Sequence, residues 1–199
     1  MNLRYFFALF TAGFGLLVPA VAGLLADPYN SARQYISELG AIGAPMAAGV
    51  NFGVFLPTGL LVLITVVWLA RTMPRRLVLP VLLLLGVAVG NFGAVLFPCD
   101  AGCPAAGTPR QGLHNLLGLV QYGSGAVALI WLGRRASQGW FVAAGIAVMV
   151  CLFLMGGPGA AWRGLWQRVA ELMLYGGLPL LASGMTDRGP IAVGARSSD

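Results

Sequence analysis

One histidine, His114, and two carboxylates, Asp100 and Glu38, are the residues of this chain best suited to proton-transfer chemistry. An imidazole titrates near neutral pH, so it can act as a general base or acid, and a neighbouring carboxylate can orient it. Hydrogen bonding of His114 to Asp100 or Glu38 without a catalytic role is the plainer alternative, and ligand binding by His114 is a third. A single histidine excludes any metal centre that needs two or three histidines from one chain.

Amide side chains lie in the same half of the apolar segments as His114. Asn51 and Asn91 each begin an Asn-Phe-Gly triplet, about 9 Å below the outer boundary of their segments at 1.5 Å per helical residue. They could bond to each other or to a shared ligand. His114 and Gln121 fall on one helical stripe, so they can face the same interior. Polar groups are costly inside a bilayer, and a one-sided cluster therefore indicates either a site or a packing network.

Arginines near the outer boundary of the apolar segments could bind an anion. The planar guanidinium can hold a phosphate or carboxylate through two parallel hydrogen bonds. Arg168 precedes Glu171 by three residues, so these two could instead pair on the helix surface. The candidate ligand-binding residues are Arg33, Ser37, Asn51, Asn91, Asn115, Gln121, Arg163, Arg168, Glu171 and Tyr175.

Two of the three cysteines, Cys99 and Cys103, are separated by three residues in a polar stretch. An extracytoplasmic loop is oxidising, which favours a disulfide between them. A zinc site with Asp100 and His114 is the alternative, but it requires reduced thiolates outside the cell and its spacing matches no standard finger. We therefore expect no metal. Cys151 lies in an apolar segment and is typical of a small buried residue.

The composition places these residues in a membrane. Of 199 residues, 58% are hydrophobic and 9% charged, and the mean hydropathy is +0.84. A segment of about 20 apolar residues crosses a bilayer. The sequence predicts an all-α integral membrane protein with a single domain over 1–186 and a mobile cytoplasmic tail over 187–199. The six expected spans lie near 5–25, 46–70, 77–97, 113–133, 139–156 and 167–186.

The arginines predict the orientation. Eight lie on the side of the two termini and four on the side of the predicted loops 26–45, 98–112 and 157–166. Basic residues favour the cytoplasm, so both termini are expected there, in the inner (plasma) membrane. The apolar run from Tyr5 to Ala26 is long for a cleaved signal peptide and is expected to remain as a span. The net charge of +6 is scattered over short loops, so anionic lipids rather than nucleic acid are the expected partners.

The first outer loop, DPYNSARQYISELGAIGAPM, predicts a short amphipathic helix from Ser31 to Leu39, closed by Gly40. This segment is expected to cap the bundle, either as a plain interfacial helix or as a lid over a head group. Most of the 29 glycines are expected to let helix backbones approach closely.

Several motifs together resemble a known family. They are "RQYISELGA", a span that opens with Asn-Phe-Gly, then "FPCDAGC", "HN" and "GLWQRVAE". In this order they resemble the bacterial and archaeal membrane proteins of domain-of-unknown-function family 998. The resemblance implies a six-span bundle and no established activity. Its polar motifs fall at Ser37, Glu38, Asn51, Pro98, Asp100, His114, Asn115 and Arg168. The segment "YISELGAIGAP" has a fainter similarity to DRAM/Frag-type six-span proteins, which is too slight to imply a reaction for this chain.

Three functions fit these observations. The first is binding of a lipid or other amphiphile in a polar pocket of the outer leaflet. The second is hydrolysis or transfer on a lipid head group or acyl ester, with His114 as base and Asp100 or Glu38 orienting it. The third is a small structural subunit of a larger membrane complex. The motifs of common hydrolases, zinc proteases, and nucleotide- or dinucleotide-binding enzymes are absent, and no cofactor is expected.

Overall fold

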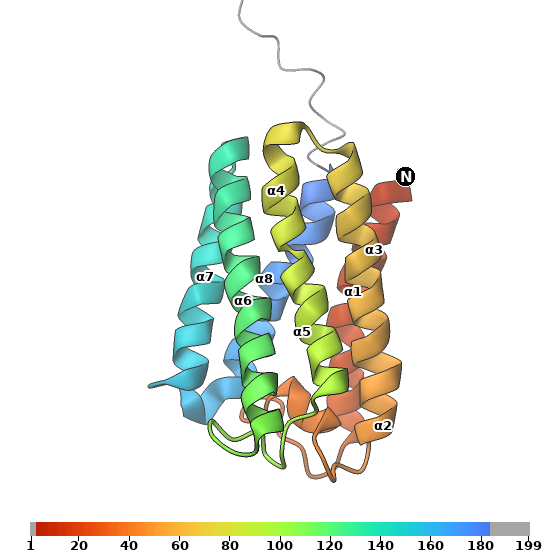
Figure 1. Cartoon of the computed structure of the whole chain (residues 1–199), viewed down its shortest axis with the longest axis vertical. Coiled ribbons are helices and arrows are strands. Elements are labelled where there is room, and N and C mark those ends of the chain that lie inside the picture. The colour runs from red at the N-terminus through yellow and green to blue at the C-terminus, as the bar shows by residue number, and fades with distance from the viewer. Residues whose placement is uncertain (1–2, 184–199) are drawn as a thin grey trace, which may run out of the picture.

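The computed structural model describes residues 3–183, and in this range the chain is helical without strands. The predicted cytoplasmic tail, 187–199, lies outside the described residues. Figure 1 shows long helices running side by side along the longest axis. The α-helices are α1 (Leu3–Leu25), α2 (Ala47–Val50), α3 (Leu56–Thr72), α4 (Arg75–Leu83), α5 (Leu85–Leu96), α6 (Pro109–Ala136), α7 (Gly139–Gly156) and α8 (Arg163–Ser183). Shorter elements are the 3-10 helices η1 (Ile36–Gly40) and η3 (Ala160–Trp162) and the π-helical turn η2 (Asn51–Phe55).

Five stretches within the described range are long and apolar enough to cross a membrane. They are Leu3–Leu25, Ala47–Thr72, Arg75–Leu96, Pro109–Ala136 and Gly139–Gly156. The expected sixth span corresponds to α8, which is 21 residues long but carries Arg163, Arg168 and Glu171 in its first turns. It packs against α1 and α7 within the bundle. The described residues therefore form an all-helical bundle compatible with a membrane, with five stretches apolar enough to cross it and one more polar helix.

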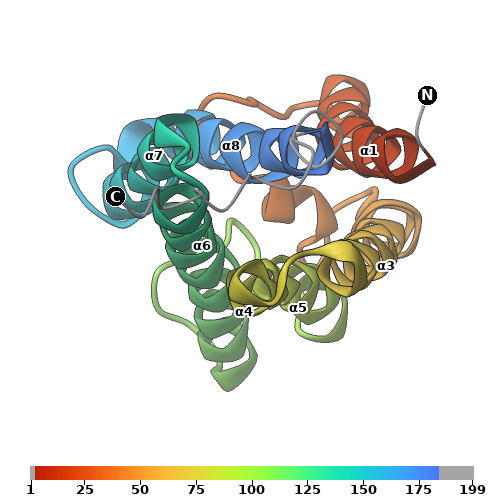
Figure 2. The same ribbon diagram turned by 90° about the horizontal axis from the view of Figure 1, so that it is seen from above.

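The helices form a closed ring, which Figure 2 shows from above. Around it, α1 contacts α3, α3 contacts α4 and α5, these two contact α6, and α6, α7 and α8 follow back to α1. The helices joined by short turns, α3 with α4 and α6 with α7, are neighbours. The start of α1 and the end of α8 lie at one end of the bundle (Figure 1). Segments 26–46, 97–108 and 157–162 lie at the other, which we call the long-loop end.

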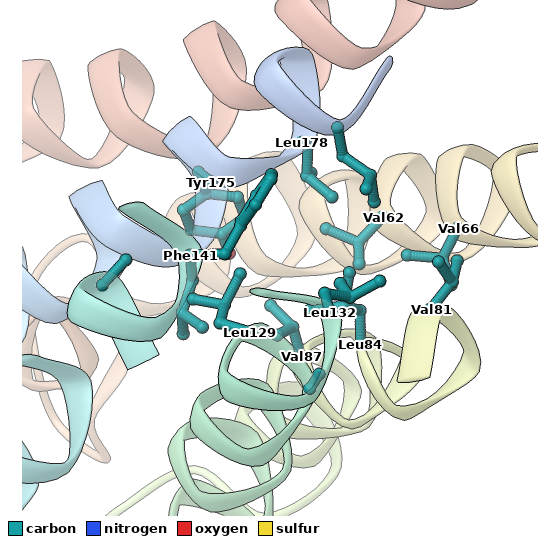
Figure 3. Close-up of a cluster of buried hydrophobic side chains, with 14 of the residues drawn as sticks. Val62, Val66, Val81, Leu84, Val87, Leu129, Leu132, Phe141, Tyr175 and Leu178 are labelled. Carbon is teal, nitrogen blue, oxygen red and sulfur yellow. The ribbon is translucent and has the colours of Figure 1, made fainter. Parts of the chain in front are cut away.

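Apolar side chains fill the ring away from the long-loop end. Figure 3 shows residues from α3 to α8 converging there, including Val66, Val81, Leu129, Phe141 and Leu178. Glycines bring α5 against α6, as expected from the composition. A Cβ on Gly90 would overlap the side chain of Gln121, so this close approach requires glycine. The glycine thereby fixes Gln121 against the wall of α5, which matters for the site below.

The prediction of a helix from Ser31 to Leu39 is wrong in its extent. The structure has a turn at 31–34, an extended Tyr35 and then η1. In an α-helix the N–H of Tyr35 would donate to the carbonyl of Ser31. Here that N–H donates to Glu38 Oε1 at 2.9 Å, and the Ser31 carbonyl accepts from Arg168. A local hydrogen bond to Glu38 and a tertiary one from Arg168 thus take the place of this helical hydrogen bond. Segment 26–46 folds across the long-loop end, with η1 inside the ring (Figure 2), and we call this segment the cap.

Candidate binding site

A cavity of about 380 Å³ lies beneath the cap at the long-loop end. Its walls come from η1, from the middle of α5, from the first half of α6, and from the facing ends of α7 and α8. Ile36, Phe55, Leu119, Leu152 and Met155 supply apolar surface. Buried polar side chains lie among them, so the cavity has the mixed lining that is typical of small-molecule sites.

Arg168 holds the cap in place. Its Nη1 donates to the carbonyls of Ser31 at 2.6 Å and Gln34 at 3.3 Å, and its Nη2 donates to the hydroxyl of Tyr29 at 2.8 Å. Burial raises the pKa of the Tyr29 phenol, against the opposing effect of Arg168. The phenol therefore stays neutral and donates to the carbonyl of Tyr35 at 2.9 Å. Arg168 does not line the cavity, and the predicted surface pair of Arg168 with Glu171 is absent from the described residues.

The other two predicted anion-binding arginines are also engaged. Arg163 forms a 2.8 Å ion pair with the buried Glu38 and donates to the carbonyl of Gly102 at 2.9 Å. Its guanidinium lies over the ring of Tyr35, 4.7 Å from the centroid, and Arg163 also reaches the cavity wall. Arg33 is exposed and lies over the ring of Trp162 at 5.5 Å. Arg163 and Arg168 therefore act first as anchors of the cap.

A directional chain of hydrogen bonds leads from the cap to Glu171. The backbone N–H of Ile36 donates to Gln167 Oε1 at 2.7 Å, which fixes the amide so that Gln167 Nε2 faces Tyr122. That nitrogen donates to the Tyr122 hydroxyl at 2.9 Å, and the hydroxyl proton is left to donate to Glu171 Oε1, also at 2.9 Å. Glu171 Oε1 is thus an acceptor, a role that the carboxyl can fill whether or not it is ionised.

Asn91 and Gln121 complete the buried polar wall. Asn91 Nδ2 donates to the Val87 carbonyl at 2.9 Å and to the Tyr175 hydroxyl at 3.1 Å. Because a carbonyl only accepts, this contact fixes the amide, and Asn91 Oδ1 has no hydrogen-bond partner within residues 3–183. Gln121 is 8% exposed, and its amide likewise makes no hydrogen bond to a described residue. Asn91 is 6% and Glu171 7% exposed, and all three line the cavity.

His114 lines the cavity, but the structure does not join it to a carboxylate. Its Nδ1 lies 2.9 Å from the carbonyl of Phe97, so Nδ1 carries the proton and Nε2 is the acceptor in the neutral ring. The expected partners are engaged elsewhere: Glu38 with Arg163, and Asp100 with Thr108 and Arg110. The predicted catalytic pair is therefore not assembled.

Asp100 organises the second long loop instead. It accepts from the backbone N–H of Thr108 at 2.9 Å and from the Thr108 hydroxyl at 3.0 Å. These bonds, the backbone one first, and the nearby Arg110 lower the pKa of Asp100. With a folded-state pKa below the ordinary one, the carboxylate favours the folded loop at neutral pH. It loses this effect as the pH falls through the lowered pKa.

Cys99 and Cys103 form a disulfide, as predicted. The bond closes a loop of few residues, so its effect on chain entropy is on the small side, below about 3 kcal/mol. The ligand atoms of both cysteines and of His114 lie within 4.8 Å of one another. Because the sulfurs are bonded to each other, they are not thiolate ligands here. Ser37 Oγ lies 3.4 Å from Cys103 Sγ, which places Ser37 at the same edge of the cavity.

The remaining predicted residues have structural partners. Asn51 Nδ2 donates to the carbonyl of Gly40 at 3.0 Å, so Asn51 supports the cap and does not meet Asn91. Asn115 lines the mouth and accepts from Gln111 Nε2 at 2.8 Å. Tyr175 lies behind Asn91, outside the cavity lining.

The structure therefore divides the predicted residues into two groups. The cavity lining includes Ser37, Asn91, His114, Asn115, Gln121, Arg163 and Glu171, while Arg33, Glu38, Asn51, Asp100, Arg168 and Tyr175 lie outside it. Sequence reasoning missed Tyr122 and Gln167. Gln167 lies one helical turn before Glu171, and this i, i+4 spacing was the available signal.

Comparisons with known proteins agree with the resemblance found in the motifs. No curated protein and no solved structure matches the chain. The family described as "Protein of unknown function (DUF998)" matches residues 9–184, nearly the whole helical bundle. On this match, the chain is a member of the DUF998 family.

Proposed function

We propose that this membrane protein binds an amphiphile, with the ligand's polar group in the cavity under the cap. The observation that carries the proposal is that polar atoms without hydrogen-bond partners line an open cavity. Asn91, Gln121 and Glu171 are all more than nine-tenths buried, yet each presents at least one polar atom that no described residue bonds. A buried polar atom without a partner is costly, and a bound ligand would supply the missing bonds.

The mouth of the cavity supports an amphiphile over a wholly soluble ligand. The exposed residues of its lining are Ala105, Asn115, Leu119, Gly156 and Ala160. They place the opening between α6 and the turn that joins α7 to α8. Leu119 is 53% exposed and lies on the apolar α6, so this side of the opening would face lipid tails. A polar group inside and an apolar chain leaving between α6 and the turn that joins α7 to α8 would satisfy both surfaces.

The hydrolase or transferase alternative has less support. His114 reaches the cavity, but neither Asp100 nor Glu38 orients it. The structural-subunit alternative predicts that the polar wall serves only helix packing, and the variants below distinguish it from ligand binding.

The proposal extends to the inner (plasma) membrane, with both termini in the cytoplasm and the cavity in the outer leaflet. Within the described residues, Arg4, Arg71, Arg75, Arg76, Arg134 and Arg135 lie at the end opposite the long loops. A membrane-impermeant thiol reagent added to intact cells should label Ala161→Cys and spare Ser137→Cys, both at exposed positions. The reverse pattern would place the cavity in the cytoplasmic leaflet.

A cavity-filling variant tests the binding itself. Gly118 lines the cavity, and a Cβ added there meets no atom within 4 Å, so Gly118→Leu should fill the space without a clash. We expect it to fold and to retain little of the amphiphile that the wild type carries through purification, measured by mass spectrometry of extracted lipids.

Gly123→Leu is the matched control. Gly123 lies on the same helix, has the same open space around its Cβ and does not line the cavity. We expect its bound amphiphile to equal that of the wild type. Equal retention by all three proteins would refute binding in the cavity and favour the structural-subunit alternative.

A further inference from the structure

Resting on the proposed function, we propose that the polar group held in this cavity is a protonated primary amine, with Glu171 as its counter-ion. The sequence favoured an anionic ligand, because three arginines lie near this boundary. The arrangement of donors and acceptors in the cavity reverses that preference.

The open polar atoms of the inner wall include three acceptors, beside the amide of Gln121, which can both donate and accept. Glu171 Oε1 accepts from Tyr122, and Glu171 Oε2 has no partner within residues 3–183. Asn91 Oδ1 is fixed as a second open acceptor by the contact of Asn91 Nδ2 with the Val87 carbonyl. Nearer the cap, His114 Nε2 is a third, because Nδ1 faces the carbonyl of Phe97. A ligand that matches this wall must bring donors.

The charges lead to the same class of ligand. Arg163 is the one cation among the lining residues, and it is paired with Glu38 at 2.8 Å. Glu171 makes no ion pair with any described residue. A carboxyl group in a membrane interior either takes up a proton or is stabilised as the carboxylate by a nearby cation. A bound cation would therefore neutralise Glu171, whereas a phosphate or carboxylate would be repelled by it.

Among cations, a primary ammonium fits best. An –NH₃⁺ group carries three N–H donors, so it can donate to Glu171 Oε2 and still offer donors to other acceptors of the lining, which include Asn91 Oδ1. A trimethylammonium group has the same charge but no donor, and it would leave both oxygens unsatisfied. The amine could belong to the head group of a membrane lipid or to a small soluble amine, and the experiment has an arm for each.

The experiment measures the thermal stability of the purified full-length protein in detergent at neutral pH, as a function of added probe. Octylammonium, octyltrimethylammonium and octyl phosphate share one apolar chain and differ in the polar group, while methylammonium tests a soluble source. We expect octylammonium to raise the unfolding temperature most, octyltrimethylammonium less, and octyl phosphate not at all. A lipid source predicts no response to methylammonium at the same concentration, and a soluble source predicts a response.

Glu171→Gln tests the counter-ion. Glutamine keeps an oxygen to accept from Tyr122 but removes the charge, so we expect octylammonium to bind at least about tenfold more weakly. Asp27→Asn is the control, because it removes one negative charge from an exposed position of the cap outside the cavity. It should bind octylammonium as the wild type does.

If Glu171→Gln does not fold, Gly118→Leu serves as the second variant, since it blocks the cavity without changing any charge. Stabilisation of the wild type by octylammonium that Gly118→Leu abolishes would support the inference. Stabilisation by octyl phosphate instead of octylammonium would overturn it, while binding of an amphiphile in the cavity would stand. No response of the wild type to any octyl probe, together with equal lipid retention by Gly118→Leu, would overturn both.

Discussion

Replacement of Arg168 by alanine is expected to lower the free energy of unfolding by about 3 kcal/mol or more, since each buried polar group left without a partner costs ~1–3 kcal/mol. The change removes the donors to the carbonyls of Ser31 and Gln34 and to the hydroxyl of Tyr29. These groups lie where the cap meets α8, and no other described side chain donates to the Ser31 carbonyl. Denaturant unfolding in detergent measures the loss, and limited proteolysis within 26–46 should become faster.

Arg33→Ala is the control for Arg168→Ala. Arg33 belongs to the cap and carries the same charge as Arg168, but it is exposed and its guanidinium lies over the ring of Trp162. An exposed cation–π contact contributes ~0.5–1 kcal/mol, so the control should lose no more than about 1 kcal/mol. Equal losses in the two variants would contradict the role of Arg168 as the anchor of the cap.

Gly164→Ala is expected to be the second most damaging change. A Cβ at this position would overlap the backbone carbonyls of Gln34 and Ser31, which cannot turn aside as a flexible side chain can. The N–H of Leu165 also donates to the carbonyl of Ala32 at 2.9 Å. Moving the cap away from the new Cβ would therefore also stretch or break this hydrogen bond. Forced overlap of this kind costs about 1–3 kcal/mol. We expect a loss near the upper end, with faster cleavage of the cap.

The matched control is Gly176→Ala on the same helix. A Cβ there meets no atom within 4 Å, and alanine has the better helix propensity, so a gain of up to about 1 kcal/mol is expected. A neutral outcome at Gly164 would mean that the cap does not approach α8 as closely as the structure has it.

The helical bundle could be predicted from the sequence because long apolar runs and short polar turns are local signals. That His114, Gln121, Asn91 and Glu171 share one half of the bundle could also be predicted, since all four lie in the halves of their spans that face the long loops. The span boundaries agree with the helices to within a few residues for most of the chain. The extra polarity of α8 was visible in the sequence as Arg168 and Glu171.

The partners of the arginines could not be predicted, for a physical reason. Arg168 binds backbone carbonyls, and every residue carries one, so no residue type marks Ser31 or Gln34 as acceptors. The same limit explains why the helix expected in the cap was predicted wrongly. Backbone groups of the cap form hydrogen bonds with Arg168 and Gln167, and the sequence does not reveal these partners. Depth alone was also a poor guide to the partner of Asn51, which was expected at the depth of Asn91 but donates to the carbonyl of Gly40 in the cap.

The most direct test of ligand binding is an experimental structure of the protein purified with its native lipids. We expect continuous density in the cavity that reaches Asn91, Gln121 and Glu171 and leaves between α6 and the turn joining α7 to α8. A cavity closed by side chains, or one that holds only ordered water while lipids are resolved on the outer surface, would contradict the proposed function.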